Sequence, residues 1–422
     1  MVENYDIIVA GGGISGAMAA IAAGREGKRV LLIERDGCLG GAATSGLVYP
    51  FARYLVKEND NLITVNSGLF TEMLNRLHTI DNYNSNDYVV YHDAAFNQET
   101  LKVVLDDMCI ENNVDVLFHS FVSDVSSNNG IVNSVSVVNK SGTTSFHAKY
   151  FIDCTGDADL CYKAGCQYNL GREQDGVCQP MTMCFRIGNV NITEFEEYKN
   201  ETIALFEKMQ NDGSIKCPGL FITFNHVGEG VLHFNSTRVV NRSGINAFEL
   251  SKAEQEGRQQ VLETYKFLKT YAKGFENCTL LSSASSIGVR ETRLVKCDYT
   301  LTADDILYCN HFEDSIACGA YLLDIHNPTG KGVELKELKG VYYHIPYRCI
   351  TPVGFNNLFV AGRCISATHE AQGACRAMPI CASVGEAAGI AATMCSEQGL
   401  SSRGIEIAEL QQRIANRGGK FK

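Results

Sequence analysis

The stretch that decides the fold lies at residues 5–41, which have the sequence YDIIVAGGGISGAMAAIAAGREGKRVLLIERDGCLGG. The apolar run Asp6–Ala10 predicts a buried strand, and an alanine-rich helix follows to about Gly24–Gly27. Arg29–Ile33 predicts a second strand, which ends at Glu34. A strand, a glycine-rich turn, a helix, a strand and an acid in this order are typical of a dinucleotide-binding βαβ unit.

Three glycines in G-x-G-x-x-G spacing join the first strand to the helix. Gly11 permits the tight turn, Gly13 lets backbone N–H groups approach a pyrophosphate, and Gly16 lets the helix pack close to the strand. The helix N-terminus adds partial positive charge, and the acid closing the second strand can accept hydrogen bonds from ribose hydroxyls. FAD and NAD both fit, and a glycine-rich turn that binds nothing is the third alternative. The predicted contacts are Gly11, Gly13, Ser15, Gly16, Glu34 and Arg35.

A glycine doublet after the second strand favours FAD over NAD. Gly40 and Gly41 resemble the doublet of the glutathione-reductase-like FAD proteins, in which it lies along the dinucleotide. The following LGGAATSG segment contains no histidine at the place where some relatives attach flavin covalently. The resemblance therefore implies FAD that is bound without a covalent link.

Composition excludes several classes of protein. The chain has 422 residues and a formal net charge of −11, with 45% hydrophobic and 20% charged residues, as expected of a soluble globular protein with two lobes. It has no lysine- and arginine-rich run, so we expect neither nucleic acid nor membrane as a partner. Residues 7–24 are apolar but contain five glycines and follow acidic residues, so we predict a cytoplasmic protein. The 17 cysteines lack C-x-x-C spacing, so we expect no metal site or redox dithiol.

The middle of the chain continues the same pattern. Asn97–Asn113 has helical periodicity, and Phe121–Ala148 contains three alternating segments that predict an antiparallel meander. Tyr150–Cys154 predicts a further strand, followed by a tight turn at Thr155-Gly156. The FAD superfamily resembled above has an alanine-Thr-Gly turn here, against the adenosine half of the cofactor. We expect cofactor contacts from Thr155, Gly156 and Asp157, and capping of a short helix is the equal alternative for Asp157.

The dinucleotide pattern stops between about Leu170 and Tyr343. We predict an α/β fold in which a Rossmann-like FAD-binding domain, with a parallel sheet and an antiparallel meander, spans residues 1–169 and 344–422. Residues 170–343 are predicted to form an inserted α+β substrate or cap domain. Ligands bind at the carboxyl ends of strands in open α/β sheets, so this insertion would cover the flavin ring and form the substrate pocket.

Arginines and histidines in this region are the candidate substrate contacts. Arg290 lies beside Glu291 in the segment SSIGVRETR, and its planar guanidinium suits a carboxylate. A salt bridge between the lobes is the alternative. His326 and His344 are each expected to be structural rather than functional. The sequence does not decide which of these residues line the pocket: Arg293, His326, His344, Tyr347 and Arg348.

The segment NNLFVAGRCISATHEAQGACRAMPICASVGEAAG near the end of the chain predicts the third part of the site. A strand at Leu358–Ala361 leads into Gly362 and Arg363, and Pro379 opens a helix that runs to about Ser396. We expect this helix to point its N-terminus at the flavin N1 and O2 edge, where its dipole stabilises the negative charge of reduced flavin. Gly362, Arg363 and Pro379 are predicted cofactor contacts.

Two polar residues before that helix are candidates for catalysis. The segment is distantly similar to the HGANR segment of fumarate reductase and succinate dehydrogenase, where the arginine helps to bind a dicarboxylate. Arg376 and His369 match that arginine and histidine by position, whereas Glu370 replaces a glycine and the spacing differs. His369 could be an acid or base, position the flavin, or be structural.

These segments together resemble the bacterial FAD-dependent oxidoreductase family over nearly the whole chain: RETR, DIHNP, IPYR and VAGRCISATHEA, with the N-terminal motifs. The resemblance implies hydride transfer between a small polar organic substrate and flavin N5, by C–H oxidation, desaturation or the reverse reduction. The sequence contains no second G-x-G-x-x-G, so the electron partner, the direction of reaction and the oligomeric state stay open. The alternatives are a flavin-bearing subunit of an electron-transfer complex and, disfavoured by the net charge, a tRNA-modifying flavoprotein.

Overall fold

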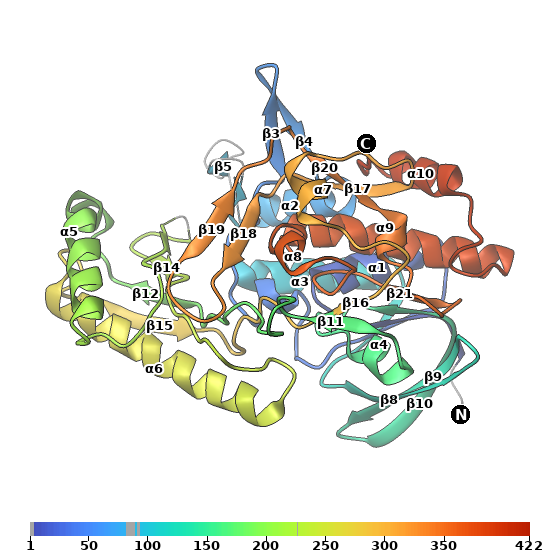
Figure 1. The fold of residues 1–422 in the computed structure, drawn as a ribbon, viewed down its shortest axis with the longest axis horizontal. Helices are drawn as coiled ribbons and strands as arrows, with labels where there is room; N and C mark the ends of the chain where they lie inside the picture. Colours follow the sequence, from blue (N-terminus) through green and yellow to red (C-terminus); the bar gives the residue numbers. More distant parts are fainter. Residues whose placement is uncertain (1–3, 82–88, 91–92, 226) are drawn as a thin grey trace.

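The computed structural model describes residues 4–81, 89–90, 93–225 and 227–422 (Figure 1). Its largest sheet has the strand order β7-β2-β1-β10-β9-β8, and a further strand pairs with β10. The parallel strands are β1 (Asn4–Ala10), β2 (Val30–Ile33), β7 (Val114–Leu117), β21 (Leu358–Val360) and the second half of β10 (Gly142–Asp153). The antiparallel meander is β8 (Phe121–Asn128), β9 (Ile131–Asn139) and the first half of β10. This mixed sheet confirms the Rossmann-like fold class.

One long strand replaces two that the sequence predicts separately. β10 runs without interruption through the last meander segment and the expected strand at Tyr150–Cys154. Its first half pairs antiparallel with β9 up to His147, and its second half pairs parallel with β1 from the same residue onward. The prediction of a break before Tyr150 is therefore wrong, because a single extended segment satisfies both ladders.

Two helices of small residues form the centre of the main body. α1 (Ile14–Arg25) and α9 (Met378–Gln398) pack on each other so closely that a Cβ atom at Gly385 or Gly389 would overlap a carbonyl oxygen of α1. α9 is long and apolar enough to cross a membrane, but 94% of its most apolar stretch is buried inside the protein. This burial accounts for its apolar composition, since a core helix needs no polar face.

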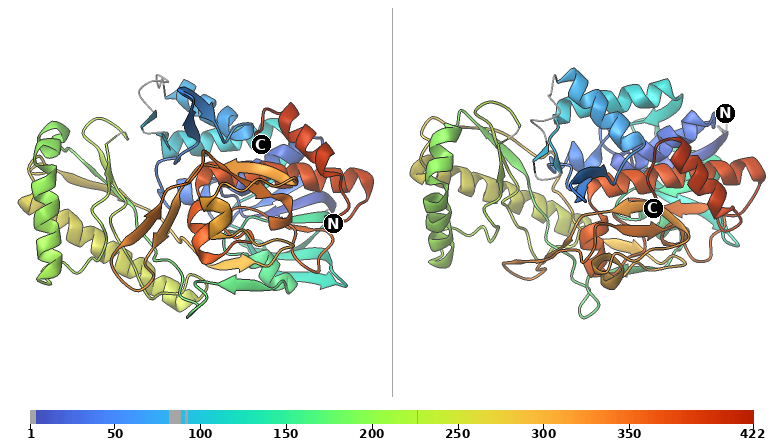
Figure 2. Two further views of the ribbon diagram at one scale, coloured as in Figure 1. Left: turned by 45° about the horizontal axis from the view of Figure 1, so that its top comes forward. Right: turned by 90° about the horizontal axis from the view of Figure 1, so that it is seen from above.

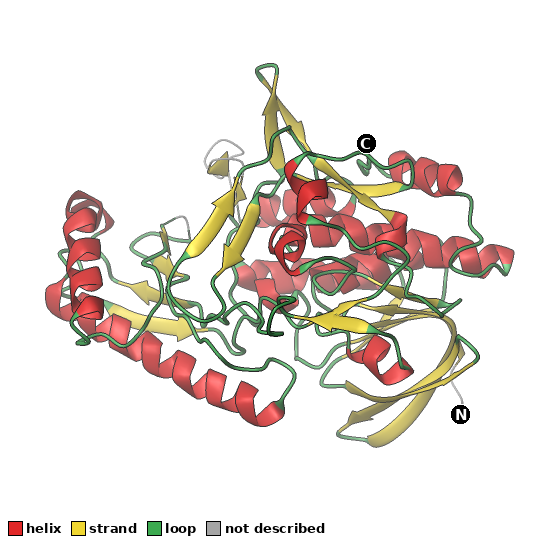
Figure 3. Ribbon diagram, in the orientation of Figure 1, coloured by secondary structure: helices red, strands yellow, loops and turns green. Residues whose placement is uncertain are grey.

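A separate lobe lies beside the main body (Figure 2). Its four-stranded sheet has the order β13 (Thr223–Phe224), β14 (Leu232–Phe234), β12 (Phe185–Gly188) and β15 (Thr279–Ser283). Two helices flank the sheet, α5 (Ile192–Asn211) and α6 (Ala247–Tyr271) (Figure 3). The hydrophobic core of this lobe draws on residues 181–289.

The later part of the region expected as an insertion packs into the main body. Leu301, Ile316 and Tyr343 belong to the same hydrophobic core as α1 and α9. The remaining elements are α2 (Leu69–Ile80), α3 (Gln98–Glu111), α4 (Asp159–Ala164), α7 (Ala303–Leu307), α8 (His369–Cys375), α10 (Ile407–Asn416) and paired strands β3 (Leu55–Glu58) with β4 (Asn61–Thr64), β5 (Val89–Val90) with β6 (Asp93–Ala94), β11 (Tyr168–Leu170) with β16 (Arg293–Val295), β17 (Ser315–Gly319) with β20 (Tyr343–Pro346), and β18 (Leu323–His326) with β19 (Val333–Lys336).

Candidate functional site

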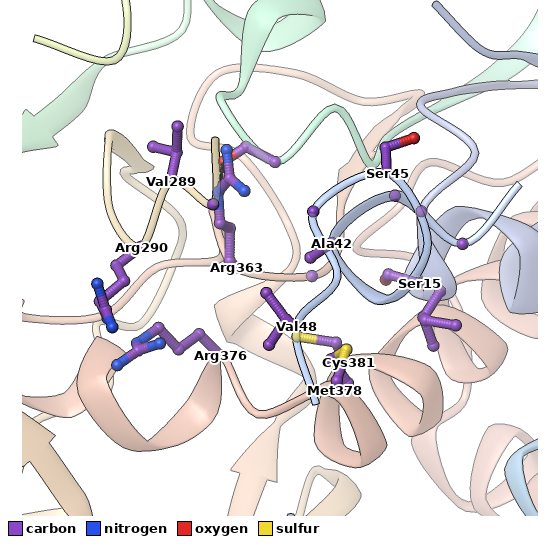
Figure 4. Close-up of a pocket in the computed structure, with 18 of the residues that line it drawn as sticks. Ser15, Ala42, Ser45, Val48, Val289, Arg290, Arg363, Arg376, Met378 and Cys381 are labelled. Atoms are coloured by element: carbon purple, nitrogen blue, oxygen red, sulfur yellow. Dashed lines mark hydrogen bonds between the residues drawn. The ribbon is translucent and has the colours of Figure 1, made fainter. Parts of the chain in front are cut away.

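A cavity of about 550 Å³ opens at the carboxyl ends of the parallel strands (Figure 4). The residues that directly follow β1, β2 and β10 line it, as does Gly362 beyond β21, and the cavity extends to the segment of the lobe around Arg290. The structure thus brings most of the predicted site into one space. The lining includes Gly11, Gly13, Ser15, Glu34, Arg35, Gly40, Gly41, Thr155, Gly156, Arg290, His326, Gly362, Arg363 and Arg376.

The glycine-rich turn has the geometry of a phosphate cradle. Gly11 has φ +94°, and a Cβ atom there would overlap the carbonyl oxygen of Cys154. Gly13 is the N-cap of α1, it lines the cavity, and a Cβ atom there would meet no atom within 4 Å. Gly16 lies outside the cavity lining, and its missing side chain lets α1 pass close to Gly11. No acidic side chain lies in the first turn of α1, so its free N–H groups can donate hydrogen bonds to an anion.

Glu34, the acid after β2, lines the cavity. Glu34 is buried, and its two carboxylate oxygens accept hydrogen bonds from Gly12 N at 2.5 Å and Asp36 N at 2.7 Å. Burial raises the pKa of Glu34 although both hydrogen bonds oppose this shift. Gly40 N donates to Gly12 O at 2.9 Å, which joins the glycine doublet to the first turn. The doublet therefore borders the same cradle.

Asp157 does not cap α4, so the capping alternative is wrong. The N-cap residue is Ala158, and its side chain makes no capping hydrogen bond. Thr155 Oγ1 accepts from Asp159 N at 2.8 Å and Asp153 Oδ2 accepts from Cys161 N at 2.7 Å, so these two side chains bind the free N–H groups instead.

Asp157 holds an arginine that borders the cavity. Arg363 donates to Asp157 Oδ1 at 2.5 Å and, through Nε, to Gly156 O at 2.8 Å. Burial would raise the pKa of Asp157, but Arg363 and Arg35 together lower it below its usual value. Asp157 itself lies outside the lining, so its contribution is to fix Arg363 beside the cradle.

The start of α9 forms another wall of the cavity. Ala377, Met378 and Cys381 line the cavity, and Pro379 occupies the first turn without touching it. The N-cap residue, Ala377, makes no side-chain capping hydrogen bond, and the first turn has no acidic residue. This helix end therefore presents uncompensated positive dipole to the cavity. Together with the α1 cradle and Glu34, it fits an anionic dinucleotide that carries a ring able to accept negative charge.

The other end of the cavity is strongly charged. Arg290 Nη1 donates to Pro180 O at 2.7 Å and to Thr182 Oγ1 at 2.6 Å. Burial, reinforced by the neighbouring charge of Arg376, lowers the pKa of Arg290 to about 10. Arg376 Nη2 lies 3.5 Å from Asp324 Oδ2. Figure 4 shows Arg290 and Arg376 side by side, away from Ser15 and the cradle.

A tyrosine and a histidine complete this end. Tyr321 Oη donates to Asp324 Oδ2 at 3.2 Å, and His326 Nε2 lies 3.3 Å from Asp324 Oδ1. Burial and the positive charge of Arg290 lower the pKa of His326 to about 3, so its ring is neutral at neutral pH. Burial would raise the pKa of Asp324, but His326 and the two arginines hold it well below its usual value.

Sequence reasoning missed Tyr321 and Asp324. A usable signal was present, because Asp324 and His326 are two residues apart on one strand and therefore share a face. Tyr321 had no comparable signal, since it lies outside a regular element.

His369 lies behind the cavity wall and is not among the lining residues. It is the first residue of α8, a helix that the sequence reasoning did not anticipate, and it is buried. Its Nδ1 lies 2.8 and 2.9 Å from the two carboxylate oxygens of Glu291, which also accepts from Gln179 N at 2.9 Å. Gln372 Nε2 donates to Arg290 O at 2.7 Å, so this buried network holds the backbone of Arg290.

The remaining candidates lie away from the cavity lining. Arg293 pairs with Asp159 at 2.9 Å, and Arg348 pairs with Asp314 at 2.9 Å. The others outside the lining are Tyr347 and His344, both buried, and Glu370, which is exposed. In the described ranges, no group of three or more His, Cys, Asp or Glu residues could hold a metal ion.

Comparison with known proteins extends these observations. Residues 6–414 match the family described as FAD dependent oxidoreductase. No curated protein matches the sequence. Solved structures that are similar include a geranylgeranyl bacteriochlorophyll reductase-like protein from Thermoplasma acidophilum, with 14% identity, a TM-score of 0.49 and coverage of 99% of this chain and 84% of that one. A p-nitrophenol 4-monooxygenase from Pseudomonas putida has 11% identity, a TM-score of 0.49 and coverage of 97% and 84%. A flavin-dependent brominase has 10% identity, a TM-score of 0.49 and coverage of 98% and 84%.

Proposed function

The chain belongs to the family of FAD-dependent oxidoreductases, and on that premise we propose that it transfers a hydride between FAD and a small polar organic substrate. When bound, the flavin supplies a two-electron acceptor or donor, and the protein supplies binding, orientation and electrostatics. The reaction class is C–H oxidation or desaturation, or the reverse reduction.

One observation carries this proposal. The cavity is continuous from the glycine-rich cradle at Gly13 to the charged cluster at Arg290 and Arg376. A substrate held by the cluster would therefore share one enclosed space with the cofactor. Proximity of this kind is the first requirement for a direct transfer between two bound molecules.

Residues of the chain have distinct roles in this proposal. The α1 cradle and Glu34 hold the dinucleotide, and the uncapped start of α9 stabilises negative charge that develops nearby. Burial, followed by the charge of Asp324, raises the pKa of Tyr321, so its Oη stays protonated, donates its one proton to Asp324 and can accept a hydrogen bond from a substrate. We assign His369 a positioning role, because it contacts Glu291 behind the wall.

Further parts of the proposal concern the surroundings of the enzyme. The Gly40–Gly41 doublet favours a glutathione-reductase-like arrangement of non-covalent FAD. We propose a cytoplasmic location and no nucleic-acid or membrane partner; all 17 cysteines are free thiols, as in a reducing compartment. The electron partner would reach the flavin through the same cavity.

The experiment that tests the function is an anaerobic screen for flavin bleaching by small polar organic compounds, run with and without NADH or NADPH. We expect the purified protein to carry FAD and at least one compound to bleach it, or to reoxidise the reduced form. Protein that is colourless and takes up no added FAD would refute the proposal. Arg376→Ala should retain FAD and lose bleaching by the substrate.

A further inference from the structure

Arg290 is a half-buried cation in the cavity lining without an ion-pair partner among the described residues. Among the described residues, its guanidinium donates to a carbonyl and a hydroxyl, which are both neutral, and no carboxylate lies within ion-pair distance. Asp324 raises the pKa of Arg290 less than burial and Arg376 lower it. A charge that is partly removed from water without an ion-pair partner is costly, and such groups are candidates for binding a ligand.

Asp324 is a weak partner for the second arginine of this pair. Arg376 Nη2 lies 3.4 Å from the carbonyl oxygen of Asp324 and 3.5 Å from its Oδ2. The buried Arg376 Nε has no hydrogen-bond partner among the described residues. The carboxylate of Asp324 is also shared with Tyr321 and His326, so its charge is divided among three groups.

The local charge balance around the arginine pair, Arg290 and Arg376, is positive. A third arginine, Arg238, lies nearby with 3% of its surface exposed, and it donates only to two carbonyl oxygens in the described chain. His326 is neutral and Arg238 lies outside the cavity lining, so the two lining arginines, Arg290 and Arg376, share the nearby charge of Asp324. Arg53, a further arginine in the lining, is already paired through both guanidinium nitrogens with Glu337 at 2.8 and 2.9 Å.

We propose that the arginine pair binds the carboxylate of a small organic carboxylate substrate. The proposal rests on the proposed function, and it specifies that the small polar substrate is an anion. A carboxylate accepts two parallel hydrogen bonds from a guanidinium, and its single charge matches the excess of the arginine pair over Asp324. A phosphate group would bring a second charge that the arginine pair and Asp324 do not balance.

The test uses protein loaded with FAD and three carboxylates, acetate, succinate and benzoate, each compared with its uncharged amide. Binding is measured by titration calorimetry and by the change in the flavin absorption band. We expect at least one carboxylate to bind about tenfold or more tighter than its amide. A hydrogen bond to a charged group is worth enough to weaken binding about tenfold to a hundredfold when it is lost, so we expect this loss in Arg376→Gln and Arg290→Lys.

The matched control is Arg53→Gln, which removes an arginine of the same cavity whose partner is Glu337. It should keep carboxylate affinity within about twofold, given the screened value of such exposed pairs. Any of three results would overturn the proposal: carboxylates and amides bind equally, inorganic phosphate binds as tightly as the carboxylates or tighter, or Arg53→Gln loses as much carboxylate affinity as the arginine-pair variants. Protein that holds FAD and is bleached by an uncharged substrate would overturn this inference alone, whereas protein that binds no FAD would overturn the proposed function as well.

Discussion

Two glycines of the N-terminal turn should respond in opposite ways to the addition of one methyl group. Gly13 has φ −61° and ψ 177°, which any residue can adopt, and its added Cβ would meet no protein atom within 4 Å. Gly11 has φ +94°, and its added Cβ would overlap the carbonyl oxygen of Cys154. Stability and cofactor binding can therefore be separated in a pair of chemically identical changes.

For Gly13→Ala, we expect apoprotein that is as stable as the parent or more so by about 0.4–1 kcal/mol, because alanine restricts the unfolded chain. The methyl group would stand in the cavity, where backbone N–H groups must approach a phosphate. Loss of one hydrogen bond to a charged group costs about 1.5–3 kcal/mol, so FAD affinity should fall about tenfold to a hundredfold. For Gly11→Ala, backbone strain and overpacking should cost about 2–6 kcal/mol of stability.

Urea denaturation of the apoproteins measures the free energy of unfolding, and quenching of FAD fluorescence measures affinity. The reasoning would be refuted by a Gly13→Ala protein that binds FAD like the parent. It would equally be refuted by a Gly13→Ala protein less stable than Gly11→Ala. A loss of both properties in Gly13→Ala would show that the turn is a packing element and not a phosphate cradle.

Three further outcomes follow from buried and exposed charges. Glu291→Gln removes the carboxylate that contacts His369 and should lower the free energy of unfolding by about 1.5–3 kcal/mol, measured by urea denaturation, while FAD content stays unchanged. Arg348→Ala breaks the ion pair between the half-exposed Arg348 and Asp314, and it should change the free energy of unfolding by less than about 1 kcal/mol in the same assay. Burial lowers the pKa of His233 to about 3 in the folded protein. As the pH drops from 6.5 toward 3, this histidine is therefore protonated in the unfolded chain but not in the folded one, and the free energy of unfolding falls. His233→Leu should make that decline shallower by up to about 1.4 kcal/mol per pH unit in thermal scans at several pH values.

Local sequence was sufficient to predict that several N-terminal residues meet at one cavity. The turn that begins at Gly11 and the acid at Glu34 are separated by one helix and one strand, so their spacing alone predicts that they lie close together. The same holds for Thr155 and Gly156 at the end of β10, because parallel strands place their carboxyl ends at one edge. Asp157 was ambiguous because capping and cofactor binding both suit an aspartate, and its actual partner, the distant Arg363, is not indicated by the local sequence.

The substrate half could not be predicted in this way, because its contacts join segments far apart in the chain. The sequence left three roles open for His369, as an acid or base, a flavin-positioning residue or a structural residue, because its partner Glu291 lies 78 residues earlier. No local pattern indicates that Thr368 caps a helix whose first residue is then buried. Local sequence also does not indicate which segments after the lobe return to the main body. β17 and β20 follow the lobe in sequence, yet they pair with each other and pack on the main core.

One glycine lies where α8 packs on β18, close to the arginine pair. Gly373 lies in α8, and a Cβ atom there would come within 2.8 Å of the carbonyl oxygen of Asp324 on β18. The missing side chain therefore sets how closely α8 approaches β18, as small residues do wherever two backbones meet. Arg376 is the C-cap residue of α8, so this approach also determines how far its guanidinium lies from Asp324. The distance of 3.5 Å between them is thus a property of helix packing, which leaves the charge of Arg376 available without an optimised internal partner.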